Sequence, residues 1–389
     1  MIEQRKANKE ELPKLMHMLD RVFFKDDEEK ENEDFLSLLP KLYKQKYQPW
    51  ENNYCVFEND EPMAAVGMYV NELSIAGEKL KLGGIGNVAV LPETRGRGYM
   101  KLTMDMAMQA IKDENCDIAE LSGDRHRYRY WGFDKAGVMV RASFSAVNLK
   151  HAFGKHELAP GWVAREVLPE DAQVLQEIQG FLESQAIHVK HDKAAMHDIL
   201  CSWRETPYAI FCEDRLAGVF TLSDDKSQAK QLYICDWVEN LEMPLRAVLS
   251  ALPEKSEVNM SIPAWNKDLI AKMEALTENF TLDTSGQFCV LNWQKVLYAL
   301  LLLQSQCKKL LDGEVKIKIV GYNGDECLKI AVNDGAPSVE QVSEDSCDIA
   351  LGHFEATSLF LAPVSPWRKC SVAQNRFPLP LMINSMDTV

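Results

Sequence analysis

The chain has 389 residues, of which 46% are hydrophobic and 26% charged, and its formal net charge is −15. This length and composition predict a globular protein of two or three domains. The negative charge argues against nucleic acid as a partner, because nucleic acid is bound by clustered cations. A cationic substrate drawn in by an acidic cleft fits the charge, and so does solubility alone.

No run reaches the roughly 18–20 apolar residues of a membrane span, and the N-terminus lacks the apolar core of a signal peptide. We therefore expect a cytoplasmic protein without a membrane partner. The ten cysteines are scattered singly, with no CxxC pair, which favours free thiols in a reducing compartment. His188, His191 and His197 have no cysteine or carboxylate partners at zinc-site spacing, so we expect no metal.

The first segment opens with apolar residues at helical spacing from Leu12 to Phe23. From Tyr54 to Val90 the pattern changes to short antiparallel strands, with turn signals at Asn59-Asp60, Glu61-Pro62, Asn71-Glu72 and Gly77-Glu78. A helix with one apolar face and a strand at Cys116–Ser122 follow. This order predicts an α+β or mixed α/β fold.

A later stretch repeats part of this pattern. Tyr208–Asp214 (YAIFCED) resembles Tyr54–Asp60 (YCVFEND), and each stretch is followed by a second strand and preceded by a helical region. Two copies of one module would produce this echo, and chance similarity of two hairpins is the alternative. The third segment has an apolar helix around Val296–Leu303, which we expect to be buried, and strands around a turn at Tyr322–Asp325.

The stretch Asn87–Met104 (NVAVLPETRGRGYMKLTM) carries the strongest chemical signal. Its strand stops at Pro92, and the turn Arg95-Gly96-Arg97-Gly98 leads directly into a helix. A turn without side chains lets backbone N–H groups approach a ligand, and the helix N-terminus adds its positive dipole end. We therefore expect an anion such as a phosphate or pyrophosphate. The pattern matches neither a P-loop nor the dinucleotide motif GxGxxG, and the alternative is a plain strand-to-helix turn.

Two motifs relate the chain to a known family. Val88–Met100 resembles the acetyl-CoA signature V-x-V-x-P-x-x-R-G-x-G of the GNAT N-acetyltransferases, and Tyr128–Phe133 resembles the family's later Y-x-x-x-G-F segment. The layout of the whole chain resembles the Eis-like (enhanced intracellular survival) acetyltransferases. This resemblance implies a catalytic GNAT domain at 1–158, a degenerate GNAT-like domain at 159–286 and a sterol-carrier-protein-like domain at 287–389. It implies two GNAT-type mixed sheets and a C-terminal α+β domain.

The resemblance also implies acetyl-CoA as co-substrate. The acceptor would be a primary amine of a cationic small molecule, such as an aminoglycoside or polyamine, or a lysine side chain of a peptide. A homo-oligomer, in the family often a hexamer, is implied as well. The strand Val88, Ala89 and Val90 would bind the pantetheine arm, with the Val90 N–H as an oxyanion donor. The amides that would hold the pyrophosphate belong to Arg95, Gly96, Arg97, Gly98, Tyr99 and Met100.

For the chemistry, the resemblance implies that Tyr128 is the general acid, with Tyr130 as the alternative. The strand before the glycine loop carries no carboxylate to act as base. In Eis-like enzymes the C-terminal carboxylate reaches the active site, which here is that of Val389. The alternatives for the base are Asp387 and the acidic stretch Asp26, Asp27, Glu28 and Glu29. His126 is close to Tyr128 in the chain, and we interpret it as a polar loop residue.

A function of another class is also open. The chain would then be a non-catalytic CoA- or lipid-binding module that uses the apolar helix and sheet of the third segment as a carrier pocket. Tyr128 and the intact glycine loop argue against this alternative, because a module without catalysis needs neither.

Overall fold

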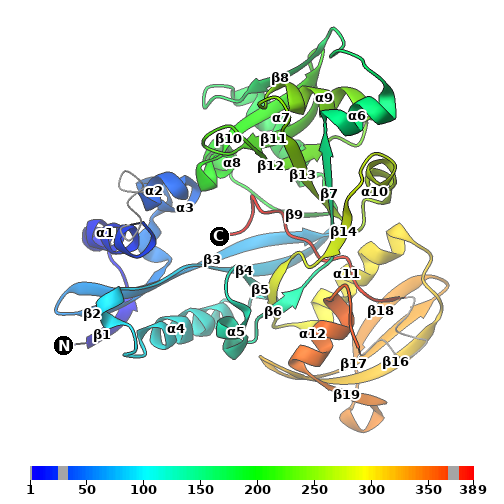
Figure 1. Ribbon diagram of the computed structural model, residues 1–389. Coiled ribbons are helices and arrows are strands. Elements are labelled where there is room, and N and C mark those ends of the chain that lie inside the picture. Colours follow the sequence, from blue (N-terminus) through cyan, green and yellow to red (C-terminus); the bar gives the residue numbers. More distant parts are fainter. Residues whose placement is uncertain (1, 25–33, 367–375) are drawn as a thin grey trace.

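The computed structural model describes residues 2–24, 34–366 and 376–389 (Figure 1). Its strands form four sheets with helices packed against them, which confirms the predicted mixed α/β class. The largest sheet contains the strands that carry the glycine loop. Its order is β1 (Ile2–Lys6), β2 (Asn53–Glu58), β3 (Glu61–Ile75), β4 (Glu78–Val90), β5 (Ile118–Leu121), β15 (Gly286–Val290) and β6 (Asp134–Ala136).

Two of the predicted turn signals in this sheet are wrong. Glu61 and Pro62 already belong to β3, where they pair with Glu58 and Phe57 of β2. The turn expected at Asn71-Glu72 does not form, because β3 continues through both residues and pairs with β4 in the register Asn71↔Leu82 and Glu72↔Lys81. The hairpin turns later, at Ala76 and Gly77, whose φ angles are 51° and 89°. A long antiparallel ladder outweighs the local turn preference of an Asn-Glu pair. The expected turn at Asn59-Asp60 is confirmed, and both residues have positive φ.

Helices cover both faces of this sheet. α1 (Leu12–Phe23), α2 (Phe35–Leu38) and α3 (Pro40–Tyr43) pack on one face, and the capping box Asn8/Glu11 precedes α1. α4 (Tyr99–Asp113) packs on the other face, where its buried residues meet Ile85, Ala119 and Leu121. Gly84 and Glu120 alternate with these residues along their strands, so they face away from α4.

The second region has a four-stranded sheet in the order β12 (Ala229–Ile234), β11 (Arg215–Leu222), β10 (Thr206–Cys212) and β8 (Trp162–Glu166). The β10–β11 hairpin is the predicted echo of β2–β3. Its ladder shifts register between Ile210 and Phe211, and that of β2–β3 shifts between Val56 and Phe57. These residues occupy the same places in the two stretches, so the hairpins share an irregularity as well as a pattern. The helices of this region are α6 (Ala146–Phe153), α7 (Ala172–Glu183), α8 (Met196–Leu200), α9 (Glu242–Ser250) and α10 (Lys267–Glu274).

In the third region, α11 (Trp293–Cys307) lies on a sheet of four strands, and the predicted burial around Val296–Leu303 is confirmed. The sheet has the order β18 (Ala336–Gln341), β17 (Gly324–Asn333), β16 (Gly313–Gly321) and β19 (Ile349–Gly352), followed by α12 (His353–Leu361). The likeness of this region to sterol carrier proteins stays a prediction.

The sheets exchange strands across the predicted segment boundaries. β15 lies between β5 and β6 of the first sheet, and β9 (Ile187–Val189) pairs with β3. β7 (Met139–Ser145) pairs with β13 (Glu257–Pro263) and β14 (Phe280–Asp283). The three segments therefore share sheets, and the boundaries at 158 and 286 stay predictions.

The C-terminal tail (residues 376–389) connects all three regions (red in Figure 1). Leu379 donates its N–H to Phe360 O (2.7 Å), and the Leu381 carbonyl accepts the N–H of Val138 (2.9 Å). Ser385 Oγ donates to Gln231 Oε1 on β12 (2.9 Å). The tail then ends over β3 and β4 of the first sheet.

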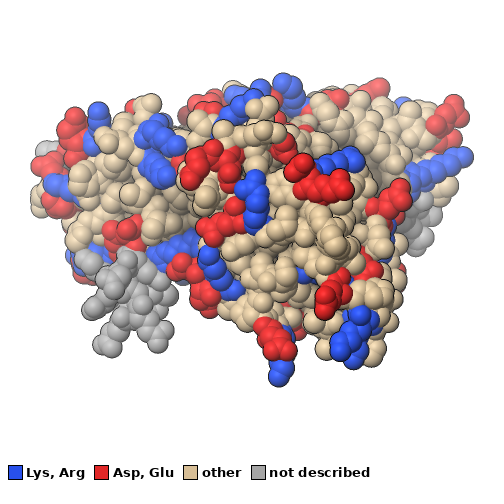
Figure 2. Space-filling model, turned by 90° about the horizontal axis from the view of Figure 1, so that it is seen from above, with Lys and Arg blue, Asp and Glu red and all other residues tan. Residues whose placement is uncertain are grey.

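Within the described ranges, no helix is long and apolar enough to cross a membrane. On the face seen in Figure 2, acidic and basic side chains are interspersed, and the described residues there form no continuous basic surface.

Candidate active site

A bulge in β4 shapes the centre of the site. The β3–β4 register shifts between Ala65 and Gly67, so that Asn87 and Val88 together oppose one residue of β3. Asn87 takes φ 41°, a left-handed conformation that asparagine adopts more readily than most residues. The bulge reverses which face each later residue of β4 occupies. Val88 consequently lies with the α4 cluster, whereas Ala89 lies with the α1 cluster.

Beyond the bulge, β4 has a neighbour on one side only. β5 pairs with β4 over Leu82–Ile85 and stops there, so among the described strands the stretch Val88–Val90 is flanked by β3 alone. An extended ligand can hydrogen-bond to such an open strand edge in the manner of an added strand. The open edge leaves room for the predicted binding of a pantetheine arm at Val88–Val90, which stays a prediction.

The glycine loop closes one end of this edge. Gly96 and Gly98 have φ 85° and 82°, values that glycine adopts without steric cost, and Gly98 is the N-cap of α4. The loop and the strand edge together line a cleft of about 760 Å³, which we call the loop cleft. Its lining residues are Val22, Val88, Val90, Thr94, Arg95, Gly96, Gly98, Tyr99, Met100, Lys101, Arg127 and Trp131.

Most of the predicted cofactor-binding residues therefore line one cleft, and two do not. The Ala89 side chain is buried on the α1 face. The Arg97 guanidinium turns away to Glu58, whose Oε1 is 3.2 Å from Nη1, and the Tyr99 hydroxyl donates to the same carboxylate. The pattern from Val88 to Met100 did not predict the cationic Lys101 and Arg127, which add positive charge at the cleft.

Tyr128 and Tyr130 differ sharply in exposure. Tyr128, at the end of α5 (Arg125–Tyr128), is 6% exposed, and its ring lies against Gly123, where a Cβ atom would be 2.5 Å from Cε2. Burial raises the pKa of the Tyr128 phenol, so it stays protonated at neutral pH. Tyr130 is 66% exposed, with its ring edge-on to Trp131. The exposed His126 donates its backbone N–H to Asp124.

Val389 lies on β4 just before the bulge. A Cβ atom on Gly84 would be 2.6 Å from Val389 Cγ2, and one on Gly86 would be 3.1 Å from the Val389 main-chain carboxyl carbon. The two glycines, two residues apart on one face of the strand, leave the room that the terminal residue fills. Gly86 is two residues before Val88, which corresponds to roughly 7 Å along the strand. The end of the tail and the inner end of the loop cleft are therefore neighbours on β4.

A buried lysine and a half-buried histidine hold the tail in place. The Lys41 ammonium, on α3, donates to Met386 O (2.7 Å) and Thr388 O (2.5 Å). Burial lowers the pKa of Lys41 to about 8, although the nearby negative charge of Asp387 acts in the opposite direction and raises it. Asp387 Oδ1 is 2.6 Å from His191 Nε2. Asp387 is thus engaged with a histidine, whereas the predicted alternatives Asp26 to Glu29 lie outside the described residues.

The family model that describes the acetyltransferase (GNAT) domain matches residues 3–136, which include β1 to β6, α4 and the loop cleft. Residues 3–136 are a GNAT acetyltransferase domain. The prediction of an acetyltransferase is thereby confirmed for this part of the chain, and GNAT domains use acetyl-CoA. The curated proteins contain no significant match to the chain.

Solved structures share the fold over almost the whole chain. A GCN5-related N-acetyltransferase from Kribbella flavida is 17% identical with a TM-score of 0.66, and the match covers 100% of this chain and 98% of that one. A probable N-acyltransferase from Enterococcus faecalis is 13% identical with a TM-score of 0.62, covering 90% and 87%. Eis1 from Mycobacterium abscessus is 14% identical with a TM-score of 0.58, covering 93% and 89%. The likeness to an Eis protein thus extends in fold beyond the GNAT domain.

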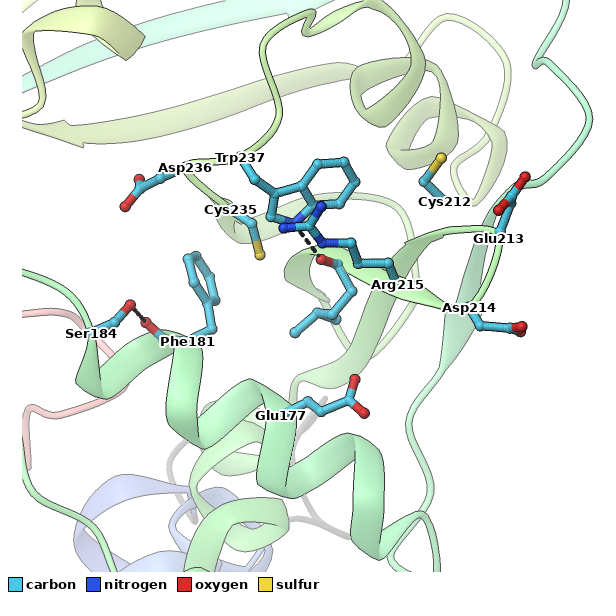
Figure 3. Close-up of a pocket in the computed structure, with 11 residues that line it drawn as sticks. Glu177, Phe181, Ser184, Cys212, Glu213, Asp214, Arg215, Cys235, Asp236 and Trp237 are labelled. Carbon is cyan, nitrogen blue, oxygen red and sulfur yellow. Dashed lines mark hydrogen bonds between the residues drawn. The ribbon is translucent and has the colours of Figure 1, made fainter.

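A second cleft of about 760 Å³ lies in the second region, where β12 leads towards α9 (Figure 3). Trp237 Nε1 donates to Leu216 O (2.8 Å), and the Arg215 guanidinium lies 4.0 Å above the Trp237 ring. This connection has no glycine loop, and four carboxylates line the cleft: Asp236 on the connection itself, Glu177 on α7, and Glu213 and Asp214 in the β10–β11 turn. Carboxylates repel phosphates, so this cleft does not suit CoA, consistent with a degenerate second copy.

The three histidines considered for a metal have separate partners. His188 Nδ1 is 2.7 Å from Gln185 O, His191 contacts Asp387, and His197 lies 3.6 Å from Cys201 Sγ. Among the described residues, no group of three or more potential ligands is arranged to hold a metal ion.

The tail contacts lead to a first prediction. Replacing Lys41 with Met removes two charge-assisted hydrogen bonds to the tail. Together they stabilise the bound tail by about 2 kcal/mol or more, so their loss should raise the equilibrium constant for tail opening roughly 30-fold. Hydrogen exchange of a peptide spanning 384–389, which includes the Asp387 amide bonded to Asn384 O, should accelerate by that factor. Lys79→Met is the control, because Lys79 is exposed and, among the described residues, forms an ion pair with Glu72 alone. Unchanged exchange in Lys41→Met would show that the lysine does not hold the tail.

Proposed function

We propose that the protein transfers the acetyl group of acetyl-CoA to a primary amine. The observation that carries this proposal is the position of Val389 on β4, next to the loop cleft lined by the same strand. One strand would then hold the acetyl donor at Val88–Val90 and the base at Gly84–Gly86.

The loop cleft supports binding of CoA. Two glycines with positive φ and the N-terminus of α4 offer backbone N–H groups, and Arg95, Lys101 and Arg127 add positive charge. These groups suit a pyrophosphate. The open edge at Val88–Val90 suits the amide groups of a pantetheine arm, and its N–H groups suit the oxyanion of a tetrahedral intermediate.

In the proposed reaction, the amine nitrogen attacks the thioester carbonyl and forms the C–N bond. The carboxylate of Val389 accepts the proton that the amine loses, directly or through water. The C–S bond then breaks, and Tyr128 donates its phenolic proton to the departing thiolate. The burial of Tyr128, which keeps the phenol protonated, supports it over the exposed Tyr130 as the acid.

For the acceptor we propose a cationic small molecule of the aminoglycoside or polyamine kind, or a lysine side chain. The net charge of −15 supports a cation. The test is thiol release from acetyl-CoA with a panel of an aminoglycoside, spermidine and a lysine peptide. Tight CoA binding without thiol release for any amine would favour the non-catalytic CoA- or lipid-binding module instead.

A loop variant tests the donor site. A valine at Gly98 must adopt φ near 82°, which costs roughly 1–3 kcal/mol and distorts the loop. We expect the KM for acetyl-CoA to rise tenfold or more, with the KM for the amine little changed. Gly77→Val is the matched control, because Gly77 has φ 89° in a hairpin turn with open space around it and does not line the loop cleft. Equal acetyl-CoA KM values for both variants and the wild type would contradict this assignment.

We also propose, on the resemblance to Eis-like enzymes, a cytoplasmic homo-oligomer, with a hexamer as the expected form. Light scattering coupled to size-exclusion chromatography measures the mass directly, and a monomer would contradict this expectation.

A further inference from the structure

A buried carboxylate next to the tail has no role in the reaction described so far. Glu120 lies on β5 and is 4% exposed, and its Oε1 is buried without a hydrogen-bond partner among the described atoms. An unpaired buried carboxyl group is costly to a fold, so its presence calls for a partner that the chain does not supply.

The position of Glu120 follows from the sheet. Glu120 pairs with Gly84 in the parallel β4–β5 ladder, and Gly84 pairs with Tyr69 in the β3–β4 ladder. Paired residues of neighbouring strands point to the same face. Val389 lies on that face against Gly84, so Tyr69 and Glu120 flank the terminal residue on either side.

The groups around Glu120 make the place acidic. Asp387 raises its pKa and Lys41 lowers it, while burial, the largest cause, brings the pKa of Glu120 to about 8. Lys41 already donates to two carbonyl groups of the tail. The carboxyl groups of Val389, Asp387 and Glu120 thus lie close to one another, with Lys41 between them. A pKa of about 8 leaves Glu120 mostly protonated at neutral pH, and a bound ammonium group favours its ionised form.

A second acceptor atom lies nearby. Asn87, one residue after Gly86, donates its Nδ2 to Asn53 Oδ1 (2.9 Å), which fixes the amide so that its own Oδ1 remains buried without a partner. The buried atoms without a partner beside Val389 are thus the acceptors Glu120 Oε1 and Asn87 Oδ1, together with the Tyr69 hydroxyl, which can donate or accept. The ligand that satisfies acceptors in an acidic, buried place is a cation with several N–H donors, such as an alkylammonium group.

We propose that Glu120 binds the ammonium group of the acceptor beside the C-terminal carboxylate and thereby selects cationic amines. This inference rests on the proposed transfer of acetyl to an amine. For an acceptor with several amino groups, one nitrogen faces Val389 for attack while a neighbouring ammonium is held by Glu120.

Glu120→Gln tests this role, because it keeps the shape and removes the carboxyl group that can ionise against an ammonium group. We expect calorimetric affinity for spermidine to fall about tenfold to a hundredfold, with CoA affinity unchanged. The KM for spermidine should rise by a similar factor. The matched control is Glu114→Gln, the same change in net charge at an exposed site after α4. Equal spermidine affinity in wild type and Glu120→Gln would overturn the proposal.

The outcomes separate this inference from the proposed function. Spermidine binding that depends on Glu120, without thiol release, would support the cation site and contradict the acetyl transfer. Thiol release with an unchanged spermidine KM in Glu120→Gln would support the transfer and overturn the cation site. A wild type that neither binds nor acetylates spermidine, an aminoglycoside or a lysine peptide would overturn both.

Thermal unfolding distinguishes a binding role from a structural one. The pKa of Glu120 is about 8 in the folded protein and 4.5 ordinarily. Between these pH values the folded protein therefore holds a proton on Glu120 that the unfolded chain has lost. The free energy of unfolding consequently falls as pH rises through this window. Glu120→Gln should therefore melt at or above the wild-type temperature, with a difference that grows from pH 5 to pH 8. A variant that melts well below the wild type throughout would mark Glu120 as structural and overturn the proposal.

Discussion

A chain lengthened by a few residues after Val389 is expected to lose almost all turnover while still binding CoA. The added peptide bond converts the proposed base into an amide. The added residues also need space beside Gly86, where there is little: a Cβ atom on Gly86 would be only 3.1 Å from the Val389 carboxyl carbon. Loss of a general base costs about 10²–10⁴-fold in rate. Thiol release at saturating acetyl-CoA measures the loss, and calorimetry with CoA measures donor binding.

Two further chains sharpen this test. Removal of Val389 shifts the carboxylate by one residue, away from Gly86, and should also reduce turnover strongly. The same extension placed before Met1 is the control and should leave turnover unchanged. Full activity in the chain extended after Val389 would exclude a catalytic C-terminus and return Asp387 to consideration as the base.

Replacing Tyr128 with Phe should lower kcat by about 10²–10³-fold, with KM values for both substrates changed only a few-fold. The substitution removes the phenolic proton donor and keeps the ring that packs against Gly123. Because burial raises the pKa of Tyr128, the wild-type phenol remains protonated into the alkaline range in which more of the amine is neutral. Steady-state kinetics of thiol release provide the measurement.

Tyr130→Phe is the control for this prediction, because Tyr130 is 66% exposed and lies two residues away. It should retain wild-type kcat. If instead Tyr130→Phe lost the activity and Tyr128→Phe kept it, the acid would be Tyr130, and the burial of Tyr128 would be a matter of packing alone.

Local patterns predicted much of the first domain. The helical spacing from Leu12, the hairpin at Asn59-Asp60 and the glycine loop all formed as expected, because each depends on neighbouring residues. The turn at Asn71-Glu72 failed where a 15-residue strand overrode a local signal. The place of β15 between β5 and β6 could not be predicted, since it depends on pairing between residues roughly 150 or more positions apart in the chain.

The part of the site that belongs to a sequence motif could be predicted, whereas the part that depends on buried side chains could not. Val88–Met100 identified most of the loop cleft, but Ala89 and Arg97 turn away because the bulge and Glu58 orient them. Glu120 and Lys41 could not be recognised in the sequence. Both matter because they are buried beside the tail, and their burial and their contacts are set only by the folded structure. The pair Gly84 and Gly86 did carry a signal: two glycines at a spacing of two remove side chains from one face of a strand.

The most direct measurement of the account is the mass of the acceptor after incubation with the protein and acetyl-CoA. The account predicts that spermidine, an aminoglycoside or a lysine peptide gains the mass of one acetyl group at an amine, with one free thiol released per acetyl transferred. Acceptors of unchanged mass beside intact, tightly bound acetyl-CoA would contradict it.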